Sequence, residues 1–548
     1  MVMVAIVLVG FLLRALPLQQ NRGLEDEALY GYWGLQIASG SDPMLDREPV
    51  DKPPFFPYLL ALSFFLFASV HTENAESGPA ADGSPIVGAP LACADSSCRA
   101  EVRQLELASR LPSLFAGTVT IALLYSLGKR LYRSPRTGLL AAFLLALSPF
   151  SVLFGSTGFV DTVMAACVVA GLVAAVFGRP GVAGLFAGLA VATKQQGLLF
   201  LPLIALAGLM SFGPVSAHDL PPSRPVAQPR WCRSAWMAWL VFVLGFLAVV
   251  CATFVWDQAR DLRPGFLEQS VISYGGLRLA PLSDIGDRAA TWFRLVTSFW
   301  ASPPLNVLFV VGLALAAHAA FLAARQDGQH LPSPVGRFRL GTAGRKESMS
   351  IAVALFLLVF LSVHLFVEVQ LWDRYLLAMV PLAAFLLARS LVVAGRGLPA
   401  GRCRAVYFPS LIALVTACVS PPLVSAEKGH LAIGGDHGAY DGIDELAAFM
   451  RVQVPPGAVL YDHWLGHHHR FYLYGAPIHV HWYPDPADLA RDAVAYRREP
   501  RYIAFPSWQE ERLSTCALID AGIGLVPVFE AHRRDTSVSF RLYQLVGP

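Results

Sequence analysis

The sequence predicts a polytopic α-helical membrane protein that carries a water-soluble α/β domain at its C-terminal end. Apolar residues make up 55% of the 548 residues and charged residues only 15%, whereas soluble proteins carry about 25% charged residues. Long apolar runs recur up to about residue 425, and beyond it the pattern changes to short alternating segments. The formal net charge of +3 is too balanced for a nucleic-acid-binding protein, which would show a concentrated basic face.

The apolar runs have the length of membrane-spanning helices, because a hydrocarbon core about 30 Å thick requires about 20 apolar residues. The long runs are 1–18, 110–128, 138–155, 162–178, 235–254, 304–323, 350–367, 376–394 and 407–424. Residues 181–212 can hold two more spans, broken at Lys194, so we expect about eleven. The first run lacks a basic flank and a small-x-small cleavage site, which favours an uncleaved anchor.

Basic connections between the runs indicate the topology. They are 129–137, 213–234, 325–348 and 395–406. By the positive-inside rule they face the cytoplasm, which puts the N-terminus inside and the C-terminal domain outside. The outer segments are then 19–109, 156–161, 255–303, 368–375 and all residues after 425. Residues 53–70 are apolar enough to span, but a span there would reverse this topology, so we predict a helix along the outer leaflet.

Two further parts of the outer region have their own composition. Residues 71–108 are rich in Ala, Gly, Ser and Pro and predict a loop insertion, in which Cys93 and Cys98 either form a disulfide or remain free thiols. Residues 426–548 predict an outer α/β domain, whereas residues 1–425 form the membrane module. In the domain we expect a helix at 440–452 and strands at 458–462, 478–482, 501–505, 525–529 and 538–545.

Carboxylates stand at two predicted outer edges of the membrane. Glu25, Asp26 and Glu27 follow the first run, where a carboxylate can act as general base toward a hydroxyl. The alternative is a solvated helix start, since acids are favoured near the positive end of the helix dipole. Asp161 stands between two strongly apolar runs, where an ionisable group is costly and often functional, or serves as an N-cap.

Cations accompany these acids. The chain strongly prefers Arg to Lys, yet Lys52 and Lys194 lie where a lipid phosphate at the outer leaflet is within reach. A compact ammonium suits a phosphate as a point charge. Arg374, at an outer helix end, is a third cation, which can alternatively pair with Asp373 or extend to the lipid headgroups.

A series of motifs in this order resembles the GT-C glycosyltransferases. The series is Arg14, Asp26-Glu27-Ala28 with Tyr30, Asp51-Lys52-Pro53-Pro54, Asp161, Thr193-Lys194 and Arg374-Tyr375. The likeness is to the branch of protein O-mannosyltransferases and bacterial aminoarabinose transferases of lipid A, and it covers roughly residues 1–425. It implies a GT-C fold and transfer of a sugar, with inversion, from a polyprenyl-phosphate donor to an acceptor hydroxyl at the outer membrane face.

The resemblance also implies roles for single residues. The catalytic residues are Asp26, Asp161 and Glu27. The residues that bind the donor phosphate are Lys52, Lys194, Arg374 and Arg14. Within these sets Asp26 is the base or acceptor-orienting carboxylate, and Glu27 is a structural acid. The chemistry agrees, because a phosphate leaving group needs cations and the attacking hydroxyl needs a base opposite.

The sequence implies no particular cofactor, and it leaves open whether the protein uses a divalent metal. The outer segment 255–303 has no histidine to supply the metal site of the aminoarabinose branch. The outer domain carries His463, His467, His468, His469, His479 and His481. Strand and turn would bring His463, His479 and His481 together as metal ligands; the alternative is surface and core histidines. The aromatic neighbours form the core or stack on acceptor sugars, and they are Trp464, Phe471, Tyr472, Tyr474, Trp482 and Tyr483.

Two other functions stay open. A transporter or flippase of polyprenyl-linked sugars would place Asp161 and Lys194 along its path, but the chain shows no repeat and its acids stand at loop edges. A membrane-anchored scaffold whose outer domain binds glycans would leave Asp26 and Lys52 without a role. The acceptor, whether lipid, protein or polysaccharide, stays open. The Arg- and Ala-rich composition without a sorting motif favours a bacterial inner membrane.

Overall fold

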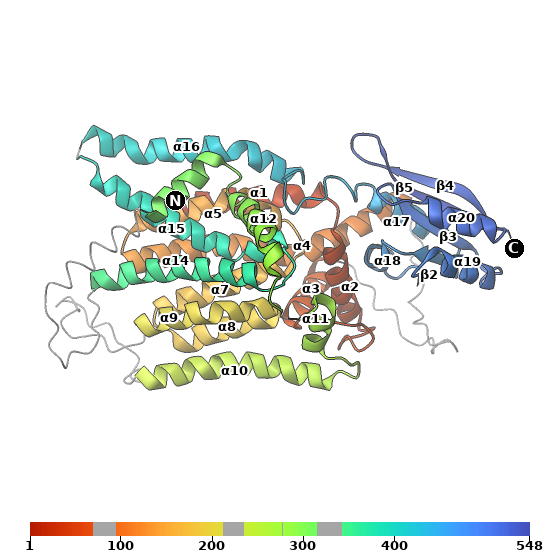
Figure 1. Ribbon diagram of the computed structural model, residues 1–548, viewed down its shortest axis with the longest axis horizontal. Helices are drawn as coiled ribbons and strands as arrows, with labels where there is room; N and C mark the ends of the chain where they lie inside the picture. The colour runs from red at the N-terminus through yellow and green to blue at the C-terminus, as the bar shows by residue number, and fades with distance from the viewer. Residues whose placement is uncertain (69–94, 212–234, 277, 315–341, 400, 548) are drawn as a thin grey trace.

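The computed structural model describes residues 1–68, 95–211, 235–276, 278–314, 342–399 and 401–547. A bundle of helices occupies most of its length, and a small sheet flanked by helices lies at one end (Figure 1). Helices α2 and α3 lie between the two, so one end of the bundle faces the sheet (Figure 1).

Helices occupy each of the predicted apolar runs. The long ones are α4 (Asp95–Tyr132), α10 (Ala235–Ala259), α14 (Thr342–Phe366), α15 (Met379–Gly397) and α16 (Arg402–Glu427). Shorter apolar helices are α1 (Val2–Ala15), α7 (Val160–Val176), α8 (Pro180–Thr193), α9 (Leu201–Ser211) and Pro303–Ala314. Over the described ranges, 5 helices are long and apolar enough to cross a membrane, or up to 6 if one bent pair forms a single span. The expected number of eleven spans stays a prediction.

The bent pair corrects one expectation. The run 138–155 is not one straight helix but two, α5 (Pro135–Ala146) and α6 (Pro149–Gly155), which meet at 62°. The helical conformation is disfavoured for Ser148, because this residue precedes Pro149. The Ser148 hydroxyl also accepts a hydrogen bond from the Ser151 amide at 3.3 Å, which caps α6. The chain breaks again at Lys194, as predicted, where α8 is followed by the short 3-10 helix η2 (Gln195–Phe200).

The first outer segment contains α2 (Glu25–Ser39) and α3 (Phe55–Phe67), and α3 falls within the predicted leaflet helix. Residues 95–108 belong to α4, so the predicted loop insertion is wrong over that part. At 38 residues α4 is roughly 57 Å long, well beyond a membrane core of about 30 Å. Its first turns therefore project out of the bundle. Cys93, and with it the choice between a disulfide and two free thiols, lies outside the described residues.

Two outer helices follow α10 along the chain, α11 (Phe266–Tyr274) and α12 (Ile285–Thr297). The sheet region, residues 443–546, has five strands at the positions that the alternation predicted. Its elements are α17 (Ile443–Gln453), β1 (Ala458–Asp462), α18 (Gly466–Tyr472), β2 (Ile478–Trp482), α19 (Pro486–Ala495), β3 (Arg501–Pro506), α20 (Arg512–Asp520), β4 (Gly524–His532) and β5 (Val538–Val546).

The sheet has the strand order β2-β1-β3-β5-β4. Strand β1 pairs in parallel with β2 and β3, whereas β5 runs antiparallel to β3 and β4. Alternate residues of β1 face opposite sides. Val459 and Tyr461 pack in a small core with Leu489 of α19 and Leu518 of α20. Leu460 belongs to the large core, which continues into the helical bundle.

The sheet region docks on the bundle through α18, α17 and the first turns of α4. The His468 Nε2 of α18 donates a hydrogen bond to the Gly23 carbonyl at 3.0 Å, just before α2. Arg22 pairs with Glu106 of α4 at 2.5 Å and with Asp444 of α17 at 3.6 Å. These contacts hold the edge of the sheet next to the start of α2.

Candidate active site

Asp26 lies in the first turn of α2, where the Glu27 carboxylate accepts a hydrogen bond from the Leu24 amide at 3.2 Å and fixes the turn. The Asp26 carboxylate forms an ion pair with the Arg374 guanidinium, which comes from the 3-10 helix η5 (Asp373–Leu376). Desolvation lowers the pKa of Arg374, but Asp26 and other neighbouring charges outweigh it and raise the pKa above its usual range.

Arg374 is positioned by aromatic rings as well. Its guanidinium lies 5.1 Å from the ring centroid of Phe159 and 5.0 Å from that of Trp372. Asp373, the alternative partner, instead accepts a hydrogen bond from the Arg374 backbone amide at 2.7 Å. The guanidinium is therefore directed to Asp26 at the start of α2.

Asp161 and Lys194 form a second ion pair. Asp161 is the second residue of α7, and Lys194 follows the end of α8. Nζ lies 2.6 Å from Oδ1, and both side chains are buried. Asp161 is not the N-cap, because that position is held by Phe159. Its other oxygen, Oδ2, is buried and has no hydrogen-bond partner among the described residues, so it is available to a bound molecule.

Lys52 and the preceding Asp51 form a third ion pair, with 2.5 Å between Nζ and Oδ2. The Lys52 Nζ also donates a hydrogen bond to the Tyr274 hydroxyl at 2.6 Å. Sequence reasoning missed both Asp51, which was seen only as part of the motif, and Tyr274. A phenol in the segment 255–303 is a candidate ligand for a phosphate, just as a histidine is for a metal.

Hydrogen bonds and ring contacts join the three ion pairs into one site. Gln195, beside Lys194, donates a hydrogen bond to the Asp51 carbonyl at 2.7 Å. The Lys194 Nζ lies 4.3 Å from the ring centroid of Tyr375, the neighbour of Arg374. We call the six paired residues the charged cluster: Asp26, Arg374, Asp51, Lys52, Asp161 and Lys194.

Glu27 lies outside the charged cluster. Its Oε2 accepts hydrogen bonds from the Arg110 Nε at 2.9 Å and from the Gly158 amide at 2.7 Å. It therefore ties α2 to α4 and to the turn before α7, which is a structural role.

Arg14 lies apart from the charged cluster, although the resemblance groups it with Lys52, Lys194 and Arg374. It is fully buried in the bundle. Its guanidinium donates hydrogen bonds to the carbonyls of Gly10, Ala146 and Leu145 and to the Ser151 hydroxyl, at 2.7 to 3.2 Å. Arg14 thus satisfies the backbone at the bend between α5 and α6, and a phosphate cannot reach it without unpacking α1.

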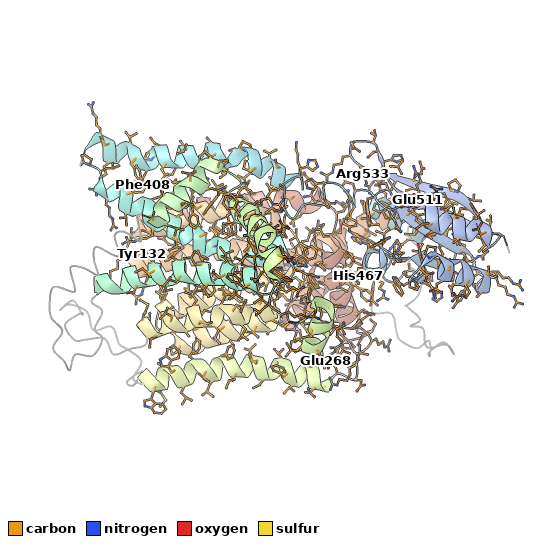
Figure 2. All side chains as sticks on the ribbon, viewed as in Figure 1. Tyr132, Glu268, Phe408, His467, Glu511 and Arg533 are labelled. Carbon is orange, nitrogen blue, oxygen red and sulfur yellow. The ribbon has the colours of Figure 1, made fainter. Side chains whose placement is uncertain are left out.

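His467 of α18 faces the charged cluster from the sheet region. Figure 2 shows it where that region meets α2. Desolvation and the charge of Arg470 lower the pKa of His467, whereas Asp26, Asp462 and Asp51 oppose the shift. The imidazole is therefore mostly neutral at pH 7, close to the carboxylates of the site.

The predicted metal ligands do not come together. The His463 Nδ1 donates a hydrogen bond to the Tyr483 carbonyl at 2.7 Å, and the His481 Nε2 lies 3.2 Å from an oxygen of Asp492. Within the part of the chain that the structure describes, no three His, Cys, Asp or Glu side chains form a group that could hold a metal ion. His479 and His481 share one face of the edge strand β2, and His463 lies beyond the end of β1.

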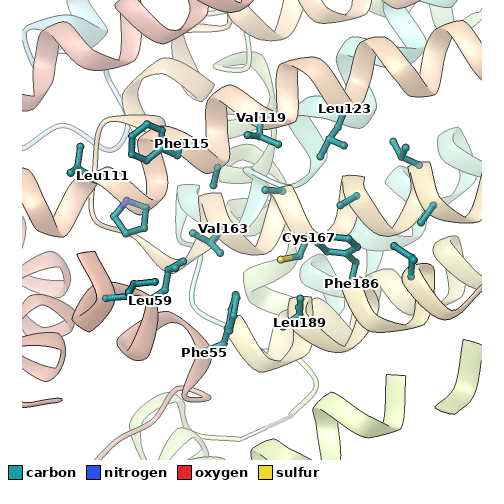
Figure 3. A pocket seen from close by; sticks show the side chains of 18 of the residues that line it. Phe55, Leu59, Leu111, Phe115, Val119, Leu123, Val163, Cys167, Phe186 and Leu189 are labelled. Carbon is teal, nitrogen blue, oxygen red and sulfur yellow. The ribbon is translucent and has the colours of Figure 1, made fainter. Parts of the chain in front are cut away.

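An apolar groove of about 690 Å³ runs between α3, α4, α7 and α8 (Figure 3). One end is lined by Phe55, three residues after Lys52, and by Val163, two residues after Asp161. The groove therefore begins beside the charged cluster. It continues along the bundle to Phe177 near the end of α7.

Fold and site together define a multi-pass membrane protein with a charged cluster at the helix ends that face the sheet region. Residues 101–216 match the model of the family described as dolichyl-phosphate-mannose-protein mannosyltransferase. The structure is similar to ArnT from Cupriavidus metallidurans bound to undecaprenyl phosphate, with a TM-score of 0.60, 13% identity, and 99% of this chain and 97% of that chain covered.

A second similar structure is the oligosaccharyltransferase of Archaeoglobus fulgidus in complex with Zn and sulfate, with a TM-score of 0.52, 15% identity, and 98% of this chain and 73% of that chain covered. Comparison with curated protein sequences gives no match. At these identities the similarity shows the fold. The predicted resemblance to the GT-C glycosyltransferases is confirmed, and the chain has their fold.

Proposed function

We propose that the protein is a GT-C glycosyltransferase that transfers a sugar, a hexose or a pentose, from a polyprenyl-phosphate-linked donor to an acceptor hydroxyl. The observation that carries this proposal is the meeting of three ion pairs at the end of an apolar groove. Three cations suit a phosphate, and the groove suits an isoprenoid chain. The ArnT structure with bound undecaprenyl phosphate supports a polyprenyl phosphate as the carrier.

In this proposal the donor phosphate replaces the carboxylates as the partner of the cations. Lys52, Lys194 and Arg374 take up the negative charge that develops on the phosphate as the sugar leaves. Tyr274 donates a further hydrogen bond once the Lys52 ammonium turns to the phosphate. The Asp161 Oδ2, which has no partner among the described residues, accepts a hydrogen bond from a hydroxyl of the sugar that is transferred.

Asp26 acts as the base. Its carboxylate accepts the proton of the acceptor hydroxyl, whose oxygen attacks the anomeric carbon from the face opposite the phosphate. The bond from the anomeric carbon to the phosphate oxygen breaks, its electron pair stays on the polyprenyl phosphate, and the product is inverted. Because Arg374 holds Asp26 in this structure, a phosphate that draws Arg374 away would also free the base.

We propose that this reaction takes place on the outer membrane face. The first turns of α4 contact the sheet region, and the basic connection after Tyr132 lies at the other end of this 38-residue helix. If that connection is cytoplasmic, the charged cluster and the sheet region are extracytoplasmic. We keep the division into a membrane module at 1–425 and an outer domain at 426–548, and the bacterial inner membrane, as parts of the proposal.

The described residues form no three-ligand metal set, and we route no step through a metal.

The proposal is tested by following sugar release from polyprenyl-phosphate-linked sugars and from nucleotide sugars, with the purified protein in lipid nanodiscs. We predict release from the lipid donor, which Asp26→Asn should lower by about 10²-fold or more, the usual contribution of a positioned base. Asp284→Asn, an equivalent change at an exposed residue of the outer segment, should release sugar at the normal rate.

Three results would contradict the proposal. Consumption of nucleotide sugars alone would show that the donor is wrong. Normal turnover in Asp26→Asn would show that another residue is the base. If no donor is consumed while labelled lipid-linked sugar crosses reconstituted vesicles, the transporter hypothesis replaces this one.

A further inference from the structure

Tryptophans follow the carboxyl ends of three neighbouring strands. Trp464 comes two residues after β1, Trp482 is the last residue of β2, and Trp508 comes two residues after β3. Because these strands are parallel, their carboxyl ends meet at the same edge of the sheet, where ligands of open α/β sheets bind. The three side chains are 50%, 60% and 45% exposed.

Ring contacts join the tryptophans into a continuous surface. The ring centroid of Trp464 lies 6.4 Å from that of Trp508 and 4.7 Å from that of His463. The His463 ring in turn is nearly parallel to that of Trp482, at 6.4 Å. At the other end Trp508 contacts Tyr440 at 6.3 Å. We call these five residues the aromatic strip.

The aromatic strip begins beside the charged cluster. Tyr440 stacks on His468 at 4.3 Å, and His468 holds the Gly23 carbonyl just before α2. Desolvation, followed by the negative charges of Glu25, Asp436 and Asp26, raises the pKa of Tyr440 to about 12. Through Tyr440 and His468 the strip starts next to the first residues of α2, and it ends at the edge strand β2.

Core packing does not explain the exposed tryptophans. The aromatic residues that the core uses, such as Phe471, Tyr472 and Tyr483, are buried. Exposed apolar surface that gathers at one edge marks a binding site in most proteins. Tryptophan and tyrosine are the residues that contribute most to binding energy when a ligand covers them.

We propose that the aromatic strip binds a neutral saccharide portion of the acceptor and guides its hydroxyl to Asp26. This inference rests on the proposed glycosyl transfer. A pyranose presents a face of C–H groups that packs on aromatic rings, and its hydroxyls project at the rim. Because His463 donates through Nδ1 to the Tyr483 carbonyl, its neutral ring leaves Nε2 as an acceptor for a sugar hydroxyl.

The strip favours a neutral saccharide over a phosphate-bearing headgroup or a charged peptide. None of its five residues carries a formal charge when His463 is neutral, whereas a charged ligand would require an opposite charge along the strip. The chain offers such charges in the neighbouring charged cluster, so donor and acceptor are recognised by different chemistry.

The test is saturation-transfer NMR with the full chain in lipid nanodiscs, which carry no sugar headgroup. The probes are mannobiose, cellobiose, chitobiose and xylobiose, with a neutral tetrapeptide beside them. We expect saturation transfer to the C–H protons of at least one disaccharide. Trp464→Ala and Trp508→Ala should each weaken this binding about tenfold, the loss of one aromatic stacking contact.

Two matched variants sharpen this test. Trp508→Tyr keeps an aromatic face and should retain most of the binding. Trp236→Ala removes a more exposed tryptophan from α10 and should leave the binding unchanged. The inference is overturned if no disaccharide receives saturation, if only the tetrapeptide does, or if the signal persists in both alanine variants.

Failure of this inference can be told from failure of the proposed function. Sugar release from the lipid donor without any saccharide binding would refute the aromatic strip alone. Saccharide binding without donor consumption would refute the glycosyltransferase and keep the strip as a glycan-binding surface. Asp26→Asn should retain saccharide binding while it loses transfer.

Discussion

In the charged cluster every functional side chain is held by a partner of opposite charge, whereas the tryptophans of the aromatic strip are half exposed and uncharged. The Asp161–Lys194 pair is buried within the bundle, but Trp482 is 60% exposed at an edge strand. A charge in a membrane protein needs a fixed partner, because an unpaired one is costly. A stacking surface needs only a stable backbone below it.

This difference predicts that the two regions respond in opposite ways to mutation. Changes in the charged cluster should affect stability and the use of the donor together. Changes in the aromatic strip should affect only the binding of saccharides.

The largest effect on stability is expected at the buried pair. Asp161→Asn leaves the Lys194 ammonium buried without an opposite charge, which should lower the free energy of unfolding by about 3–5 kcal/mol. The double variant Asp161→Leu/Lys194→Met should recover most of this stability and still fail to use the donor. Thermal unfolding, followed by intrinsic fluorescence, measures the first effect, and sugar release measures the second.

Trp508→Ala is the matched comparison, since it should change the unfolding temperature little. Equal destabilisation by Asp161→Asn and Trp508→Ala would show that the two regions do not differ in the way proposed.

The next effect concerns His468, through which the sheet region docks on the bundle. Burial lowers the pKa of His468 to about 3, whereas an unfolded histidine has a pKa of about 6.5. The unfolded state therefore binds a proton first as the pH falls below 6.5, and stability is lost between pH 6.5 and 3. At pH 5 the loss from this one residue is about 2 kcal/mol.

Hydrogen exchange of α18 as a function of pH measures this loss. His468→Phe keeps the ring stacked on Tyr440 but cannot take up a proton, so its exchange should depend less on pH. The same pH dependence in wild type and variant would show that His468 does not control the docking of the sheet region.

Five of the six residues of the charged cluster were candidates from the sequence, and there is a physical reason why they lie together. Asp26, Lys52, Asp161, Lys194 and Arg374 stand at the ends of apolar runs, and alternate crossings of a membrane return such ends to the same side. The parity of the spans therefore brings together residues that are far apart in the chain. Arg14 also stands at the end of a run, but hydropathy does not show that the bend between α5 and α6 draws it into the bundle.

The aromatic strip was less accessible to sequence reasoning. Alternation along each strand is local, so the positions of β1, β2 and β3 could be predicted. The strand order and parallel pairing are not local, and they alone bring Trp464, Trp482 and Trp508 to one edge. The same limit explains why His463, which follows β1, was expected to meet His479 and His481 of β2 at a metal.

A smaller effect is expected where the charged cluster meets the donor. Lys52→Ala should raise the KM for the polyprenyl-linked donor at least about tenfold, because a hydrogen bond to a charged group contributes about 1.5–3 kcal/mol. Tyr274→Phe removes only the phenol that contacts Lys52, and it should raise the KM about fivefold. Steady-state kinetics at saturating acceptor measure both values, and an equal rise in the KM for the acceptor would argue that Lys52 only packs the loop.

The smallest effect is expected at the far end of the aromatic strip. Among the described residues of the strip, Trp482 has a ring contact with His463 alone, so a short saccharide bound next to Tyr440 and Trp508 does not cover it. Trp482→Ala should therefore leave the binding of chitobiose unchanged and weaken the binding of its tetrasaccharide about threefold, at the lower end of one stacking contact. Titrations of both saccharides, followed by saturation transfer, measure the ratio. If Trp482→Ala weakens the binding of the disaccharide and of the tetrasaccharide equally, the saccharide does not extend along the strip from Asp26 toward β2. The direction proposed for the acceptor is then wrong.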